Sequence, residues 1–249
     1  FSYEYSTSEW FAGWVALRFL QKPQIATKHF LNMYNNVRYA ISKSRAAYWL
    51  GRSYAKLQDH DESRYWYEIA TNYNTTYYGQ MAMLELNKNI SISLPKYEQP
   101  LESELRYFVE NNEFVKIALY YAYLGEIQKS YKFFHHHILA NPTNGHIKKI
   151  IAISVYTNNP VLINKISRLA NRFNVASKEN YPVLKNLDKS NDKRKNAVIM
   201  SIIKQESGFD ISAISNAGAV GFMQLLPSTA KEMARSCLLY TSPSPRDLY

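Results

Sequence analysis

The stretch that decides the fold runs from Ala46 to Tyr73 and reads AAYWLGRSYAKLQDHDESRYWYEIATNY. Apolar and aromatic residues recur in it at helical spacing on both sides of a polar turn at Gln58–Asp61. Gly51 lies within the first half, where the absence of a side chain lets a neighbouring helix approach closely. We therefore predict two antiparallel helices joined by a short turn.

This pair of helices has the marks of a repeat. Leu50-Gly51, Tyr54, Tyr67 and Ala70 resemble the helix-turn-helix repeat of the tetratricopeptide type, although Ser63 stands where that repeat favours alanine. Stacked units of this kind form a solenoid in which each repeat contacts mainly its neighbours.

Similar patterns continue along the chain. A second unit spans Ile117–Ala140 and is ended by Asn141-Pro142, and two more helices are expected at about Gly145–Tyr156 and Pro160–Phe173. No strand signal rises above this pattern. We therefore predict an all-α fold, with a helical-repeat superhelix over residues 1–173.

Composition sets the broad class of the protein. Of 249 residues, 46% are hydrophobic, which is ample for a packed core and excludes a disordered chain. The net charge of +10 indicates a general attraction to anions. No compact block of Lys and Arg is present, so we do not expect a nucleic acid partner. The 21 tyrosines are expected mostly to pack between helices.

Several features are absent from the sequence. Cys237 is the single cysteine, so no internal disulfide can form. The start, Phe1-Ser2-Tyr3, has no signal-peptide pattern, and no apolar run reaches the ~20 residues that span a bilayer. His135–His137 are consecutive and point three ways on a helix, so we expect neither a metal site nor a cofactor.

A second informative stretch, Ala197–Ala234, reads AVIMSIIKQESGFDISAISNAGAVGFMQLLPSTAKEMA. Its apolar start predicts a buried helix whose last turn delivers Glu206, because Ser207-Gly208 then breaks the helix. A carboxyl group in apolar surroundings has a raised pKa, because desolvation disfavours its charged form. Such a pKa suits a general acid.

Small residues follow this glutamate, from Ser212 to Gly221, in a pattern that favours neither helix nor strand. Glycines of this kind mark positive φ angles or a close approach of the backbone to a partner. A new helix is expected to begin at Pro227. One acid, a wall of small residues and the amide of Gln224 predict a groove for a polar, hydroxyl-rich ligand.

The order of these residues resembles the opening motifs of soluble lytic transglycosylases, lysozyme-like enzymes that cleave bacterial peptidoglycan. Phe222 departs from the usual leucine and Leu226 from a common methionine, and the later Ala-Tyr-Asn block of the family is absent. The matching residues are Glu206, Ser207 and Phe209 in the first block, Ser215, Gly218, Ala219, Gly221, Met223 and Gln224 in the second, and Pro227, Thr229 and Ala230 in the third.

The resemblance implies a function and a set of site residues. Glu206 would act as acid and then as base, while the C6 hydroxyl of the substrate's N-acetylmuramic acid attacks and gives a 1,6-anhydro product. Ser215 and Gln224 would hydrogen-bond the substrate, with Gly221 and Met223 beside them. Peptidoglycan strands would be the partner and the periplasm the location, with membrane attachment left open.

The resemblance also predicts the domains. After the superhelix, which some family members have, we expect a polar linker at 174–196, the start of the catalytic domain at 197–236, and a non-native tail at 237–249. Because the catalytic domain is truncated, we expect the chain as given to be inactive and the apolar face of its helix to stay wet or loosely docked.

Two other functions remain open. Water in the same site would make a lysozyme-type hydrolase. A helical-repeat protein that binds a peptide or protein in its concave face, without catalysis, is the non-enzymatic reading. Asp210 lies four residues after Glu206, where a second acid would stand, but we expect it to be a surface or capping residue.

Overall fold

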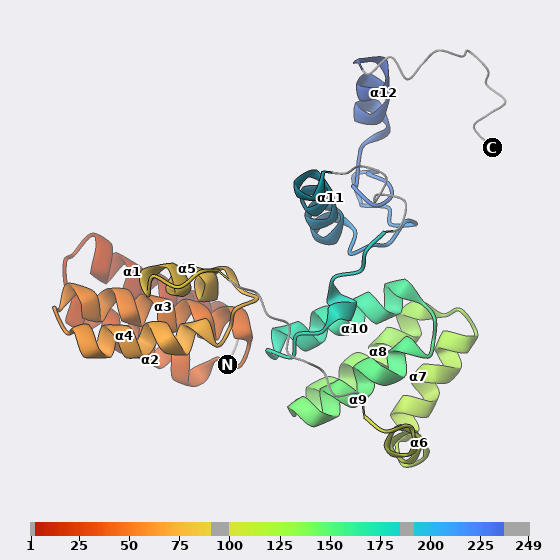
Figure 1. The fold of residues 1–249 in the computed structure, drawn as a ribbon, viewed down its shortest axis with the longest axis horizontal. Coiled ribbons are helices and arrows are strands. Elements are labelled where there is room, and N and C mark those ends of the chain that lie inside the picture. The colour runs from red at the N-terminus through yellow and green to blue at the C-terminus, as the bar shows by residue number, and fades with distance from the viewer. Residues whose placement is uncertain (1–2, 91–99, 185–191, 237–249) are drawn as a thin grey trace.

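The computed structural model describes residues 3–90, 100–184 and 192–236, and within these ranges the regular structure is helical, which confirms the all-α prediction. None of the helices in these ranges is long and apolar enough to cross a membrane. Figure 1 shows the helices as two groups, α1–α5 and α6–α10, with α11 and α12 beyond them. The helices are α1 (Tyr3–Arg18), α2 (Pro23–Asn36), α3 (Ala40–Lys56), α4 (His60–Thr71), α5 (Tyr77–Glu85), α6 (Glu102–Glu110), α7 (Glu113–Tyr123), α8 (Ile127–Ala140), α9 (Asn144–Val155), α10 (Pro160–Arg172), α11 (Lys193–Glu206) and α12 (Pro227–Ser236), with a short 3-10 helix η1 (Lys178–Asn180).

The predicted hairpin is formed by α3 and α4. Gly51 faces the ring of Tyr67, and a Cβ at Gly51 would lie 2.6 Å from two atoms of that ring. Ser63, the departure from the repeat pattern, donates a hydrogen bond of 2.9 Å to the carbonyl oxygen of Gly51. Asp59 caps the start of α4 by accepting from the Glu62 N–H at 3.1 Å. The two helices are therefore joined by close packing and by a buried polar contact.

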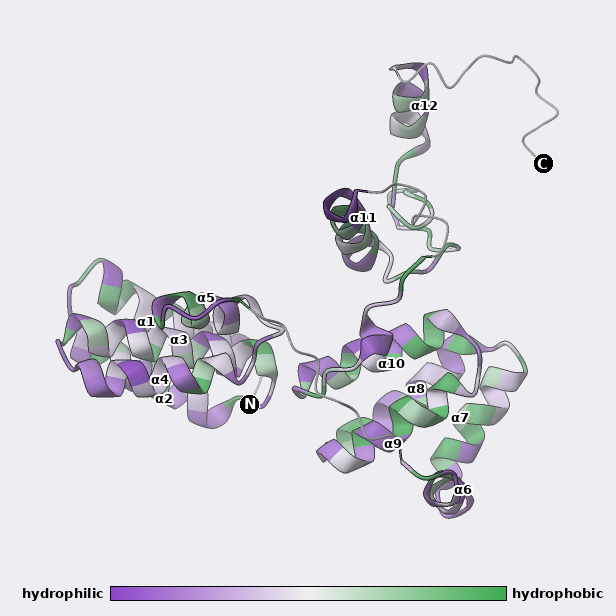
Figure 2. Cartoon of the chain, viewed as in Figure 1, coloured by the Kyte–Doolittle hydropathy of each residue, from purple (hydrophilic) through white to green (hydrophobic). Residues whose placement is uncertain are grey.

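The helices of α1–α10 bury two separate cores. Hydrophilic and hydrophobic residues alternate along these helices (Figure 2), as expected for helices that bury one face. The first core, within α1–α5, is centred on Phe30 and Leu50, and the second, within α6–α10, on Phe134 and Ile150, all of them fully buried. Each core is built within one group of helices.

The two groups meet at a small, mostly polar junction. The hydroxyl of Thr75 donates to the side-chain oxygen of Asn171 at 3.1 Å, and the amide of Asn174 donates to the carbonyl oxygen of Asn72 at 3.1 Å. The ring of Tyr39 packs edge-on against Phe173, with centroids 5.3 Å apart. A junction of this kind holds the groups side by side without merging their cores.

The residues that follow α10 remain packed against the helices α6–α10. Residues 175–177 and Asn180 are buried against these helices, and Val175 belongs to the core of α6–α10. The first part of the predicted linker is therefore packed structure. Part of that linker (185–191) and the predicted tail (237–249) lie outside the described residues.

Candidate active site

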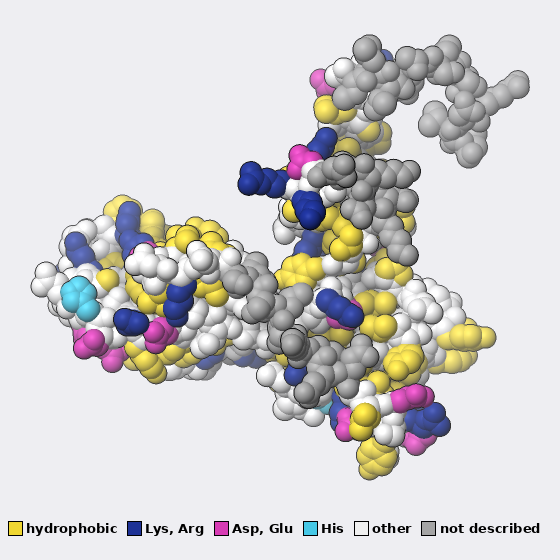
Figure 3. All heavy atoms as spheres, in the orientation of Figure 1, with side chains coloured by type: hydrophobic (Ala, Val, Ile, Leu, Met, Phe, Trp, Pro, Cys, Tyr) yellow, Lys and Arg dark blue, Asp and Glu magenta, His cyan; other side chains and the backbone are white. Residues whose placement is uncertain are grey.

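Helix α11 carries the candidate acid. It begins at Lys193, four residues before the predicted start at Ala197, because Asp192 caps it by accepting from the N–H groups of Arg194 and Lys195 at 3.0 and 3.1 Å. The polar run that was assigned to the linker therefore forms the first turn of the helix. Lys and Arg side chains stand out around α11 in Figure 3.

The predicted apolar surroundings of Glu206 are not formed. Glu206 is the last residue of α11, as expected, but its side chain is exposed. Along the helix, Ile203 is buried, whereas Val198 is 58% exposed and Ile202 is 38% exposed. The exposure of Val198 and Ile202 agrees with the expectation that the apolar face stays wet or loosely docked, whereas Ile203, which was included in that expectation, is buried. The burial that the sequence argument expected for this carboxyl group is therefore absent from the structure of the described residues.

The segment after Glu206 is a compact loop tied by its own hydrogen bonds. Two isolated antiparallel bridges pair Ile214 with Val220 and Val220 with Leu225. The backbone N–H of Ser215 donates to the carbonyl oxygen of Ala219 at 2.9 Å, and the Ala219 N–H donates to the Ser215 hydroxyl oxygen at 3.0 Å. Residues 211–225 are called the glycan loop below, after the ligand that the sequence motifs imply. Its small residues close this loop tightly.

Gln224 fastens the glycan loop from inside. Its side-chain amide donates to the carbonyl oxygens of Ala213 at 3.0 Å and Gly221 at 2.9 Å. These two bonds use both hydrogens of the amide. Gly221 has a φ of 73°, and its N–H donates to the Ala213 carbonyl oxygen at 2.9 Å. Two of the predicted site residues therefore shape the loop itself, and Met223 is half-buried within it.

The predicted site residues divide into two sets. Ser215, Gly221, Met223 and Gln224 all belong to the glycan loop, whereas Glu206 lies before it at the end of α11. In the described ranges, no hydrogen bond or ion pair joins Glu206 to that loop. The structure thus places the candidate acid and the candidate binding residues on consecutive elements without a direct bond between them.

Asp210 has the capping role that was expected of it. Its carboxylate accepts from the backbone N–H of Ser212 at 3.0 Å and from the Ser212 hydroxyl at 2.6 Å. Both bonds close the turn that leads into the glycan loop.

Sequence reasoning missed the residues that hold the turn after Glu206. Asn164 of α10 donates its side-chain amide to the carbonyl oxygen of Gly208, and Phe209 is buried next to it in the chain. Lys204 lies 3.5 Å from the ring centre of Tyr181. Burial, followed by the positive charge of the nearby Arg168, lowers the pKa of Lys204 to about 8. The signal in the sequence was a polar Asn164 within the apolar stripe of a helix.

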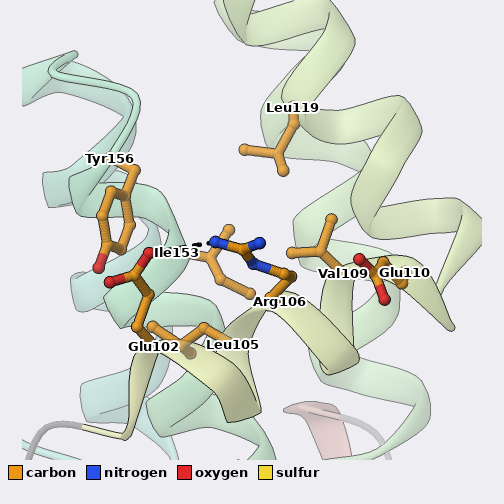
Figure 4. Close-up of a pocket in the computed structure, with 8 residues that line it drawn as sticks. All are labelled: Glu102, Leu105, Arg106, Val109, Glu110, Leu119, Ile153 and Tyr156. Atoms are coloured by element: carbon orange, nitrogen blue, oxygen red, sulfur yellow. Dashed lines mark hydrogen bonds and ion pairs between the residues drawn. The ribbon is translucent and has the colours of Figure 1, made fainter.

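A hollow of about 320 Å³ lies elsewhere, among α6, α7 and the end of α9 (Figure 4). Its walls are mostly apolar, with Leu105, Val109 and Ile153 among them, and Arg106 crosses it to reach Glu102 at 3.5 Å. Figure 1 shows α6 on the side of its group away from α11, so this hollow is separate from Glu206.

Comparison with known proteins bears on the part of the chain that carries Glu206 and on the fold. Residues 185–248 match the family model of the transglycosylase SLT domain. This range contains α11, the glycan loop and α12. It extends into the segment that was expected to be a non-native tail.

Solved structures match almost the whole chain. One is the lytic transglycosylase Slt inactive mutant from Pseudomonas aeruginosa, at a TM-score of 0.66 and 20% identity, over 97% of this chain and 39% of that one. Another is the 70-kDa soluble lytic transglycosylase in complex with bulgecin A, at a TM-score of 0.57 and 16% identity, over 98% of this chain and 38% of that one. At these identities the structures show a shared fold, and the chain spans less than two-fifths of their length.

The fold and the matched segment define the class of protein: a helical-repeat protein whose residues 185–248 match the transglycosylase SLT domain. The family-model match and the shared fold agree with the sequence motifs. The chain therefore resembles soluble lytic transglycosylases in its fold and, over residues 185–248, matches the model of their SLT domain.

Proposed function

We propose that this chain contributes the helical part and the start of the catalytic domain of a peptidoglycan lytic transglycosylase. The observation that carries the proposal is the match to the SLT domain over residues 185–248, which include Glu206 at the end of a helix. The matched structures support it: one is described as an inactive mutant of a lytic transglycosylase, and the other as a soluble lytic transglycosylase bound to bulgecin A.

The proposed reaction uses one carboxyl group twice. Glu206 donates its proton to the oxygen that bridges N-acetylmuramic acid and N-acetylglucosamine, and the β-1,4 bond breaks through an oxocarbenium-like transition state. The C6 hydroxyl of the same muramic residue then bonds to C1, and its proton passes to the ionised Glu206. No water is consumed, the product is a 1,6-anhydro sugar, and the carboxyl group is restored.

The glycan loop would bind the substrate through the atoms that its own hydrogen bonds leave open. The Ser215 hydroxyl oxygen accepts from a backbone N–H, so its hydrogen is the atom for a substrate acceptor. Both hydrogens of the Gln224 amide are engaged within the loop, so its carbonyl oxygen is the atom for a substrate hydroxyl or acetamido N–H. Gly221 and Met223 would form the wall beside them.

The chain as given is proposed to be inactive. Glu206 is exposed and α12 has no buried residue, so in the described ranges no second wall faces the acid. General acid catalysis needs the carboxyl group positioned against the substrate in a site that shifts its pKa. We place the activity of the complete protein in the periplasm, because its proposed substrate is the bacterial cell wall.

Replacing Glu206 tests the proposal. In a chain that carries the complete SLT domain, Glu206→Gln keeps the size of the side chain, removes its titrating proton and should lower glycan cleavage by about 10²–10⁴-fold. Asp210→Asn is the matched control, because it alters a nearby carboxylate that caps a turn and should leave cleavage close to the parent. Cleavage by Glu206→Gln within about threefold of the parent, well short of a general acid's contribution, would remove this residue from the mechanism.

The products separate a transglycosylase from a hydrolase. Digestion of purified peptidoglycan by the same complete chain should release muramic ends that lack one water, as measured by mass spectrometry. Reducing muramic ends alone would assign a lysozyme-type hydrolase instead. Binding of peptidoglycan or of a protein partner without any bond cleavage would assign the non-enzymatic alternative.

A further inference from the structure

The turn Ser207–Phe209, which directly follows Glu206, is held by α10 and not by the loop that it leads into. The Asn164 side chain donates to the carbonyl oxygen of Gly208 across 44 residues of sequence. Phe209 is 6% exposed, whereas the side chain of Glu206, three residues earlier, is open to solvent. The turn is therefore anchored at Gly208 and Phe209, while the carboxyl group of Glu206 is exposed to solvent.

The space around Gly208 is fitted to this contact. Gly208 has a φ of 62°, and a Cβ there would lie 2.6 Å from Nη1 of Arg168 and 3.1 Å from Nδ2 of Asn164. Phe209 also has a positive φ, of 67°, which is uncommon for an aromatic residue. Such a backbone persists only where the surroundings fix it. Here the surroundings include two side chains of α10.

An asparagine at position 164 lowers the stability of the fold. It is 1% exposed, and its other side-chain atom, Oδ1, is buried without a hydrogen-bond partner in the described part of the chain. A buried polar atom without a partner lowers stability. A leucine at this position would avoid that cost, so the reason for asparagine is the bond that its Nδ2 donates to Gly208.

We infer that Asn164 is a positioning residue for the catalytic glutamate. By holding Gly208, it fixes the end of α11 and thereby sets where the Glu206 carboxyl group lies against the substrate. This inference rests on the proposed function. It makes α10, a helix of the repeat region, part of the active-site framework, although it does not touch the substrate itself.

The test uses a chain with the complete SLT domain and three substitutions. Asn164→Leu keeps about the same size and removes the donor. It should lower kcat by about 10–10²-fold with KM near that of the parent, because a small misplacement of a reacting group costs rate. Ser167→Ala is the matched control, since Ser167 is also fully buried on α10 and its hydroxyl has no partner in the described residues. It should leave kcat unchanged.

Gly208→Ala disturbs the contact between Asn164 and Gly208 by changing the acceptor residue. A Cβ there would crowd Asn164 and Arg168, so kcat should fall to a similar extent. The double variant should lose little more than the worse single variant, because both changes disturb the same contact. Thermal unfolding, followed for each variant, separates this role from stability. A lower midpoint with parent-like kcat at a temperature where the protein is folded would assign Asn164 to stability alone.

The outcomes also separate this inference from the proposed function. If Glu206→Gln abolishes cleavage while Asn164→Leu matches the parent in kcat, the positioning role is overturned and the proposed function stands. If Glu206→Gln retains cleavage, the glutamate is not the acid, and both the proposed mechanism and the positioning role of Asn164 are contradicted. Loss of kcat in Asn164→Leu and Gly208→Ala, without loss in Ser167→Ala, supports the positioning role.

Discussion

Gly51 marks a close approach between α3 and α4. Because a Cβ there would lie 2.6 Å from the Tyr67 ring, Gly51→Ala should force apart two buried elements and destabilise the protein by about 1–3 kcal/mol. Gly145→Ala is the control: no atom lies within 4 Å of the position of its Cβ, so that change should be neutral or slightly stabilising. Urea denaturation measures both, and equal midpoints for the two variants would contradict the packing argument.

His146 gives the helical part a pH dependence. Burial, followed by the neighbouring His137 and Lys149, lowers its pKa from 6.5 to about 4. The rings of His137 and Phe108 pack against it, with centroids 4.6 and 5.1 Å away. Between pH 6.5 and about 4 this histidine binds a proton in the unfolded chain but not in the fold. Its contribution to the free energy of unfolding should therefore be complete above pH 6.5 and should decrease as the pH falls towards 4.

The measurement compares urea midpoints at about pH 7 and about pH 5, where the linkage between proton binding and unfolding predicts a difference. His146→Gln should reduce that difference. His60→Gln, at an exposed position on α4, should preserve it. An unchanged difference in His146→Gln would show that other groups control the pH dependence.

Single residues in the sequence carried part of this information. The close approach at Gly51 follows from a glycine within an aromatic helix pattern. The pairing of His146 with His137 does not, because it depends on how α8 and α9 pack. Ser63 appeared as a departure from its repeat, and only its bond to the Gly51 carbonyl oxygen explains it.

At the scale of elements, the glycan loop depends on Gln224. Gln224→Glu replaces the amide donor by a carboxylate that would face the carbonyl oxygens of Ala213 and Gly221. Each of the two lost bonds is worth about 1 kcal/mol net, so the Gly221 amide should exchange with solvent roughly thirtyfold faster. Gln205→Glu, at an exposed position of α11, is the control and should leave that exchange unchanged. Hydrogen exchange measured by NMR decides the outcome.

The limits of α11 show what a pattern can and cannot predict for an element. Its end was predicted correctly, because Ser207-Gly208 interrupts the helix pattern directly. Its start was wrong by four residues, because the charged run after Asp192 looks like a linker until the Asp192 cap is seen. The exposure of Glu206 depends on which surfaces are present to cover it, and hydrophobic periodicity does not contain that information.

At the scale of the whole molecule, two cores predict two unfolding transitions. All four tryptophans lie in α1–α4, so tryptophan fluorescence reports the first core, whereas far-ultraviolet circular dichroism reports both. Phe30→Ala should shift the transition seen by fluorescence. Phe134→Ala should shift only the transition of the second core, which is seen by circular dichroism and not by fluorescence. Each change removes a fully buried ring and should cost about 3–5 kcal/mol.

The two variants serve as controls for each other. Coincident transitions by the two probes, with Phe134→Ala moving the fluorescence midpoint as much as Phe30→Ala, would show that the helical part unfolds as one unit.

The sequence indicated the helical class and the order of the parts, because helix periodicity and turn residues are local. It did not indicate that the helical region divides into two cores, because both have the same apolar pattern and only the small polar junction at Asn171 and Asn174 separates them. Nor did it indicate that residues 175–177 pack onto α10. Both features arise from contacts between residues far apart in sequence.

The contact between Asn164 and Gly208 bears on how such proteins can be recombined. A designer who joins the repeat region of one relative to the catalytic part of another would cut in the polar segment at 174–196, which has the composition of a linker. That cut takes Asn164 from one relative and Gly208 from the other, so a chimera would combine a donor and an acceptor that did not evolve together. Moving the crossover to between α5 and α6 keeps α10, and the core that it shares with α6–α9, in the same piece as the turn that it holds.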